Sequence, residues 1–355
     1  MTIDRLTLRN FLMFTGEKEF YYKNVDFPDE LTVSYGNSFE AEFIKGINVF
    51  IGSNATGKST LLKCIYAACE YSNEKTTPNK AKQFKDYFSS SKKPIKDINQ
   101  KQSDDDFGLL QVYSGDNEFH YRAWDNGILS LEKWLELGIK SILIPTTEML
   151  SHSDGLIAMA SKYGIPFDHT QIDILVNAQL WETNEISDVN QSLLETISSI
   201  IGGEVKYEDD TFYVLKQNGL KVEFSLEAEG YRKLGLLWKL IRNGLLENGS
   251  ILLWDEPEAS INPGLMPLLV DILYNLKNNG VQIFLATHSY MLAKYLDVKK
   301  KNNNDVLFHS LHKNENDEID IFSSYDYSTL KFNPIEASEE KLYNSYGDFS
   351  VTPIR

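Results

Sequence analysis

The sequence predicts an α/β fold built on a mostly parallel sheet that is flanked by helices, and three segments of the chain predict it. Residues 47–51 form a short apolar run that leads into a glycine-rich stretch and then into a helical pattern. Residues 251–254 and 281–286 are two further apolar runs, and each ends in polar side chains. Short, continuously apolar strands are typical of a parallel sheet that is buried on both faces. We therefore expect a ligand site at the carboxyl edge of this sheet.

The glycine-rich stretch fits the phosphate-binding pattern G-x-x-x-x-G-K-[ST] in the strand–turn–helix context that this pattern requires. Glycines let backbone N–H groups close around phosphate oxygens at a helix N-terminus. We expect Lys58 to reach the β- and γ-phosphates of a nucleotide and the Ser59 hydroxyl to ligate Mg²⁺. The predicted nucleotide-binding residues of the loop are Gly52, Ser53, Asn54, Ala55, Thr56, Gly57, Lys58, Ser59 and Thr60.

The two later strands end in residues that nucleotide hydrolysis requires. The run at residues 251–254 leads into Asp255 and Glu256, which is the pattern of a Walker B strand with a glutamate after the aspartate. We expect Asp255 to hold Mg²⁺ and Glu256 to polarise the water that attacks the γ-phosphate. The third run leads to His288, in position to hydrogen-bond the γ-phosphate and the attacking water. Glu256, His288 and Lys58 are therefore the predicted catalytic residues.

These three elements, in this order, resemble the ABC-class ATPases. Within that class, the phrase D-E-P-E-A-S-I-N-P at residues 255–263 is similar to the soluble SMC/RecF-like branch rather than to membrane transporters. Residues 3–11 also resemble the first strand of that branch, I-x-x-L-x-L-x-N-F, and the resemblance assigns Arg9 and Asn10 to nucleotide binding. It implies ATP and Mg²⁺ as ligands, and an ABC-ATPase head with a P-loop sheet, an antiparallel β subdomain and a short helical insertion lobe.

In ABC-class proteins, a signature loop from a second subunit completes the site. The candidate here is residues 227–233, in which Gly230 heads an apolar helix that would offer N–H donors and a positive dipole end to the γ-phosphate. Ala228 stands where the family has a serine, and the missing hydroxyl contact favours slow turnover. The resemblance implies a nucleotide-sandwiched dimer or higher homo-oligomer, with the turn at residues 260–262 at the subunit interface.

A further metal contact is expected from the loop that ABC-class proteins place beside the phosphates. Residues 142–148 are a strand that breaks into polar residues, so Glu148 or Thr147 is a candidate to contact Mg²⁺ or the attacking water. Gln111, on a strand predicted near residues 109–113, is the competing candidate.

The chain is predicted to divide into a discontinuous head, an insertion and a tail. The head comprises residues 1–71 and 215–335, the insertion residues 72–214, and the C-terminal tail residues 336–355. Within the insertion we expect a mobile polar loop at 72–106, a hairpin at 107–124, a helical lobe at 150–202 with a break at 164–166, and a second hairpin formed by 204–215 and 220–226.

No heptad pattern persists in the insertion, which argues against long coiled-coil arms. The compact head is similar to the ATPase domain of the OLD family and to the ATPase subunits of anti-phage systems such as PARIS and Septu. The phrase I-P-T-T-E-M-L-S-H at residues 144–152 resembles such ATPases. No nuclease or toxin motif is visible, so a separate effector protein is the expected partner.

Composition limits the compartment and the partners. No segment offers eighteen consecutive apolar residues, no signal peptide is visible, and the two cysteines, Cys64 and Cys69, share one predicted helix, so we expect a cytoplasmic protein without membrane contact. The net charge of −16 disfavours DNA binding by the whole surface. A local basic patch remains open, and Lys299–Lys301 is the candidate, with a solvated loop as the alternative.

Three functions are compatible with these motifs. The first is a slowly hydrolysing ATPase that dimerises around ATP and acts as a scaffold or sensor for a separate effector in anti-phage defence. The second is a RecF-like DNA repair or replication ATPase that clamps DNA in its ATP-bound dimer. The third is a transporter nucleotide-binding subunit, against which the phrase at residues 255–258 and the missing signature serine both count.

Overall fold

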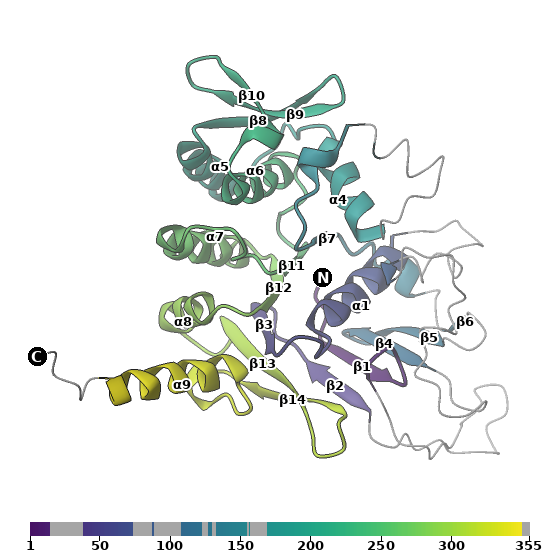
Figure 1. Cartoon of the computed structure of the whole chain (residues 1–355). Coiled ribbons are helices and arrows are strands. Elements are labelled where there is room, and N and C mark those ends of the chain that lie inside the picture. The colour runs from purple at the N-terminus through teal and green to yellow at the C-terminus, as the bar shows by residue number, and fades with distance from the viewer. Residues whose placement is uncertain are drawn as a thin grey trace, which may run out of the picture.

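The structure is a computed structural model that describes residues 1–14, 38–73, 87–88, 108–122, 127–129, 133–154, 156 and 169–349. Most of the polar loop expected at residues 72–106, and the break expected at residues 164–166, lie outside these residues. The described part is an α/β fold in which helices and a second sheet flank a central sheet (Figure 1). The fold class predicted from the sequence is confirmed.

The central sheet has six strands in the order β14-β13-β3-β12-β11-β7. All neighbouring strands run parallel except β14, which pairs antiparallel with β13. The strand bounds are β3 Ile47–Gly52, β7 Ser141–Ile144, β11 Ile251–Asp255, β12 Gln282–Thr287, β13 Val306–Lys313 and β14 Ile319–Ser324. The three apolar runs that predicted the parallel sheet are therefore neighbours in it, as β3, β12 and β11.

Alternate residues of the central strands point into two different hydrophobic clusters. On β3, Val49 belongs to the cluster that contains the helices after residue 169, whereas Phe50 belongs to the cluster that contains α1 (Lys58–Tyr71). Both side chains are fully buried. A strand that is buried on both faces reads as continuously apolar, which is why residues 47–51 predicted this position.

An antiparallel sheet packs with α1 on one side of the central sheet. Its order is β2-β1-β4-β5-β6, with bounds β1 Arg5–Arg9, β2 Phe39–Glu42, β4 Leu109–Ser114, β5 Asn117–Arg122 and β6 Gly127–Leu129. The hairpin predicted at residues 107–124 is β4 and β5, and β4 also pairs with β1 at the start of the chain. Gly115 takes a φ of +56° at the tip of this hairpin.

The other side of the central sheet is covered by helices and a three-stranded sheet. The elements are α4 His169–Gln179, α5 Asp188–Ile201, β8 Gly203–Glu208, β9 Thr211–Lys216, β10 Lys221–Glu223, α6 Glu229–Arg242, α7 Met266–Asn278 and α8 Tyr290–Lys299. The expectation of one strand over residues 204–215 is wrong: the chain turns at Asp209 and Asp210, which both have positive φ, so β8 and β9 form a hairpin. Two consecutive residues of positive φ are the geometry of a tight hairpin turn.

The last element that the structure describes is α9, Pro334–Phe349, which begins against the core at Ile335 and whose later turns project from the rest of the molecule (Figure 1). The predicted division into head, insertion and tail stays a prediction. Strands from residues 72–214 do not form a sheet of their own, however, because β7 pairs with β11 and β4 pairs with β1. In the part of the chain that the structure describes, no helix combines the length and the apolar character needed to cross a membrane.

Candidate functional site

A cavity of about 300 Å³ lies at the carboxyl edge of β3 and β11. Ten residues line it: Met13, Asn54, Ala55, Gly57, Lys58, Ser59, Thr60, Asp255, Glu256 and His288. Nine of these were predicted as site residues, and they come from three segments that are far apart in the sequence. Met13 is the one that sequence reasoning missed, because it follows residues 3–11, on which the resemblance rests, and its apolar side chain carries no signal of a ligand contact.

The loop between β3 and α1 has the backbone geometry of a phosphate cradle. Ala55 and Gly57 have φ values of +63° and +91°, and α1 begins at Lys58 without a side-chain cap. A Cβ on Gly57 would lie 2.5 Å from the Phe14 ring, so only glycine fits there. An uncapped helix N-terminus with its N–H groups directed at the cavity favours an anion. The loop therefore fits the phosphates that its sequence predicts.

Lys58 bridges the start of the loop. Its Nζ donates hydrogen bonds to the carbonyl oxygens of Gly52 at 2.8 Å and Ser53 at 2.9 Å. Burial lowers the pKa of this ammonium group to about 8, although Asp255, Glu256 and Glu258 oppose the shift. Thr56 supports the same loop, because its hydroxyl donates to the Ser53 carbonyl at 2.9 Å. The carbonyl oxygens that now accept from Lys58 are neutral, and a bound phosphate would give the ammonium group a charged acceptor, which forms a stronger hydrogen bond.

The lowered pKa of Lys58 predicts that nucleotide affinity falls at alkaline pH. Below pH 8 the free protein holds the proton that phosphate binding requires, so affinity is at its maximum. Above pH 8 Lys58 loses its proton in the free protein, whereas in the complex the bound phosphates would keep Lys58 protonated. The affinity for ATP should therefore fall by up to about tenfold per pH unit. Isothermal titration of ATP from pH 7 to 9.5 measures this effect, and proton uptake on binding at pH 9 is its signature. An affinity that does not change over this range would contradict it.

Asp255 and Glu256 stand at the end of β11, facing Lys58. Glu256 has a φ of +49°, an unfavourable conformation for a residue with a Cβ, and its N–H donates to the Ala286 carbonyl at 2.8 Å. The Glu256 carboxylate lies 3.9 Å from Nε2 of His288. Burial and the Lys58 charge lower the pKa of His288, which favours a neutral imidazole near pH 7. A carboxylate and a neutral imidazole at one cavity wall can jointly orient a water molecule.

Glu258 organises the end of β12, a role that the sequence did not indicate. Its Oε1 accepts hydrogen bonds from the Thr287 hydroxyl at 2.6 Å and from the His288 backbone N–H at 3.0 Å. Thr287 in turn accepts from the N–H of Ser289, which begins α8. The side chain of Glu258 therefore fixes the backbone from which His288 projects. The third acidic residue of the phrase D-E-P-E, Glu258, therefore differs in role from Asp255 and Glu256.

Seven predicted site residues do not line this cavity, and three of them, Gly52, Ser53 and Thr56, belong to the phosphate loop itself. Arg9 and Asn10 are buried at the end of β1, where Arg9 belongs to the antiparallel sheet, and only Met13, three residues further on, reaches the cavity. Glu148 accepts hydrogen bonds from the N–H groups of Leu150 and Ser151 and pairs with Arg232 at 3.5 Å. In this arrangement Glu148 faces α6 rather than the phosphate loop.

The competing candidate Gln111 does not line the cavity either, because it lies in the antiparallel sheet with its Nε2 donating to Glu118 at 2.7 Å. Gly230 is the last of the predicted residues outside the cavity. It lies in the first turn of α6, where a Cβ would come within 2.7 Å of the Ser260 carbonyl oxygen. The N-terminus of α6 has no side-chain cap, and Leu226 and Tyr231 beside it are exposed. The candidate signature loop therefore faces outward from its own chain.

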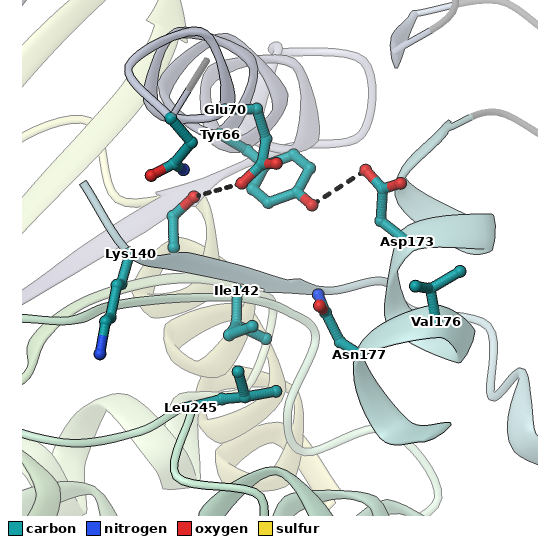
Figure 2. Close-up of a pocket in the computed structure, with 10 residues that line it drawn as sticks. Tyr66, Glu70, Lys140, Ile142, Asp173, Val176, Asn177 and Leu245 are labelled. Atoms are coloured by element: carbon teal, nitrogen blue, oxygen red, sulfur yellow. Dashed lines mark hydrogen bonds between the residues drawn. The ribbon is translucent and has the colours of Figure 1, made fainter. Parts of the chain in front are cut away.

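A second cavity of about 300 Å³ lies near the opposite edge of the sheet, between the end of α1, the start of β7 and α4. Figure 2 shows its acidic side chains held by neighbours: the Tyr66 hydroxyl donates to Asp173 at 2.9 Å, and the Ser141 hydroxyl donates to Glu70 at 3.1 Å. Since α1 rises about 1.5 Å per residue, Tyr66 is about 12 Å from Lys58 along the helix axis. This cavity is therefore separate from the phosphate loop.

Comparisons with known proteins agree with this geometry. Residues 173–294, which include α6, β11 and His288, match the family model described as "AAA domain, putative AbiEii toxin, Type IV TA system". A comparison with curated proteins found no match.

Among solved structures, an SMC head bound to the C-winged helix domain of ScpA is similar with a TM-score of 0.51 and 11% identity over 91% of this chain and 98% of that one. The SMC head domain from Thermotoga maritima has a TM-score of 0.43 and 14% identity over 91% and 99% of the two chains. An SMC head from Pyrococcus furiosus has a TM-score of 0.49 and 10% identity over 95% and 98%. The chain thus has a fold similar to that of an SMC head domain.

Proposed function

We propose that this chain binds ATP with Mg²⁺, hydrolyses it slowly, and dimerises around it as a scaffold or sensor that controls a separate effector protein in anti-phage defence. The observation that carries the proposal is the gathering of Lys58, Ser59, Asp255, Glu256 and His288 around one cavity while the uncapped start of α6 faces away from it. The residues around the cavity would bind one nucleotide. The N-terminus of α6 would contact the nucleotide that is bound by a second copy of the chain.

Each residue at the cavity has a chemical role in the proposed reaction. Lys58 and the N–H groups at the start of α1 would neutralise and orient the phosphates. Ser59 and Asp255 offer the oxygen ligands that Mg²⁺ prefers, and the bound ion would screen the charge on the phosphate oxygens. Glu256 would accept the proton of the attacking water, and His288, kept neutral, would orient that water.

The proposed dimer follows from the position of the signature loop. Gly230 belongs to the same chain as the phosphate loop but does not line its cavity. Dimerisation would place the α6 N-terminus of one copy against the phosphates of the other, where its N–H groups and dipole stabilise negative charge. Ala228 stands at the N-cap and offers no hydroxyl, so the contact would rest on the backbone alone. Weaker stabilisation of the transition state is the physical reason for slow turnover.

Replacing Gly230 with alanine should weaken the dimer without affecting the nucleotide pocket. The added Cβ would lie 2.7 Å from the Ser260 carbonyl oxygen, so α6 must shift against the turn at residues 260–262. Overpacking of this kind costs about 1–3 kcal/mol, and a loss of the same size at the interface would weaken the ATP-dependent dimer about five- to 150-fold. Light scattering in the presence of ATP measures the fraction of dimer. The affinity of the monomer for ATP is the internal control and should not change. A variant that dimerises like wild type would contradict the proposed interface.

The effector role is supported by two kinds of observation. The similar SMC head was solved bound to a domain of ScpA, so this fold serves elsewhere as a platform for another protein. Two of the three lysines of the candidate basic patch are also paired with carboxylates of the same chain: Lys299 pairs with Asp271, and Lys300 pairs with Asp297 and Asp326. These ion pairs reduce the positive charge that the patch offers to DNA.

Purification from the native host tests this role. A nucleotide-locked dimer, obtained with Glu256→Gln, should retain the effector, whereas Lys58→Ala should not. Strong stimulation of ATP hydrolysis by duplex DNA, with no bound protein, would instead support a RecF-like clamp.

A further inference from the structure

A buried lysine on α6 contacts the backbone of the proposed catalytic base. Lys233 is 2% exposed, and its Nζ donates a hydrogen bond to the carbonyl oxygen of Glu256 at 3.1 Å. Removing an ammonium group from water is costly unless charges and hydrogen bonds replace the solvent. Here the carboxylates of Glu229, Glu258, Glu256 and Asp255 supply the compensating charge, because all four act on the Lys233 ammonium. Lys233 does not line the nucleotide cavity, so its position requires another explanation.

Glu256 is a residue whose backbone needs to be held. Its φ of +49° lies in the left-handed region, which costs about 1–3 kcal/mol for a residue that is not glycine and persists only where neighbours enforce it. Three contacts do so: the Glu256 N–H donates to Ala286 on β12, and the Glu256 carbonyl accepts from the nearby Ala259 N–H at 3.1 Å and from Lys233 on α6. Together they fix the two peptide groups that flank the Cα, and thereby the direction of the carboxylate.

We infer that Lys233 is a positioning residue that holds the Glu256 carboxylate at the γ-phosphate of the nucleotide bound by the same chain. The N-terminus of α6, the helix that carries Lys233, would contact the nucleotide bound by the partner subunit. The inference rests on the proposed function, since it assigns Lys233 to the same reaction. Arg232, the adjacent residue, joins α6 to the loop after β7 through Glu148. The first turns of α6 are therefore tied to two loops of their own chain, and only the tie through Lys233 ends at the base.

Replacing Lys233 with methionine tests the inference, because methionine keeps the length and the buried stem but has no donor. We expect kcat to fall about tenfold to hundredfold, the usual cost of misplacing a catalytic group by about 1 Å. ATP affinity should stay within about twofold of wild type. Lys233→Arg, which retains a cationic donor, should recover part of the rate. Lys239→Met is the matched control: Lys239 is also buried on α6, but its Nζ pairs with Glu182 far from the base, so kcat should not change.

Mixed dimers show in which site Lys233 acts. When Lys233→Met in one subunit is paired with Glu256→Gln in the other, the only functional base is the unsupported one, so hydrolysis should be slow. When both substitutions lie in the same subunit and the partner is wild type, the rate should equal that of Glu256→Gln paired with wild type. A slow rate in this second dimer would mean that Lys233 acts on the nucleotide of the partner, and would overturn the inference.

The inference and the proposed function fail in different ways. If the wild-type protein does not turn over ATP, the proposed function is wrong and the inference falls with it. If the wild type is active and Lys233→Met has an unchanged kcat, or loses activity only through ATP affinity, the inference alone is wrong. If the loss appears equally in Lys239→Met, the effect is structural, which also overturns it.

Discussion

Replacing Glu256 with glutamine is expected to abolish ATP hydrolysis while ATP binding survives. Glutamine keeps the size of the side chain and can still hydrogen-bond, but it cannot accept a proton from water. Removal of a general base lowers rates by about 10²–10⁴-fold. Because Lys58, Ser59 and the phosphate loop are unchanged, ATP affinity should stay within about twofold. The bound nucleotide then persists, and the dimer that depends on it becomes long-lived.

Single-turnover hydrolysis, ATP titration and light scattering measure the three parts of this prediction. Glu247→Gln is the matched control, since Glu247 is an exposed carboxylate that pairs with Lys140 and does not line the cavity. Wild-type turnover in the Glu256→Gln variant would exclude Glu256 as the base. A variant that loses ATP binding together with hydrolysis would show that Glu256 holds the nucleotide.

Replacing Lys58 with alanine is expected to remove nucleotide binding. The ammonium group lies in the phosphate cradle, where we expect it to donate to the β- and γ-phosphates, and hydrogen bonds to charged groups contribute about 1.5–3 kcal/mol each. Loss of two such bonds to the nucleotide would weaken ATP binding by about 10²–10⁴-fold. The fold should persist, because the carbonyl groups of Gly52 and Ser53 lie beside an open cavity where water can replace the lysine.

Thermal unfolding with and without ATP measures this second prediction directly. Ligand binding to the native state raises Tm, so the wild type should be stabilised by ATP and the Lys58→Ala variant should not. Lys45→Ala, at an exposed position just before β3, is the control and should respond to ATP like wild type. An ATP-dependent rise in Tm for Lys58→Ala would contradict the proposed role of the lysine.

The sequence predicted the parts of this molecule that rest on short-range rules. The phosphate loop is a local motif, and the strands before it and before Asp255 are buried on both faces, so their apolar runs are unambiguous. His288 was predicted as a site residue because an apolar strand precedes it directly, and it lines the cavity. In each case, residues that are adjacent in the chain carry all the information that the prediction used.

The interactions that were missed depend on partners far away in the chain. The contact of Glu148 with Mg²⁺ stays a prediction, and the pair that Glu148 forms with Arg232, 84 residues later in the chain, is one that no local pattern reveals. Lys233 looks like an ordinary lysine of an amphipathic helix, and only the packing of α6 on the end of β11 shows that it is buried. The turn at Asp209 and Asp210 could have been found, since paired aspartates tolerate positive φ.

The order of strands in the central sheet also determines when the chain can fold. Strand β3 at residues 47–52 pairs with β12 and β13, and the N–H of Ile3 donates to the side chain of Gln282. Pairing over such sequence separations is slow, and apolar strands stay exposed until their partners are synthesised. The antiparallel strands β1, β2, β4 and β5 can pair once residue 122 has emerged from the ribosome. The phosphate loop is among the first segments to be synthesised, but the strand before it can pair with β12 only after more than two hundred further residues have been made.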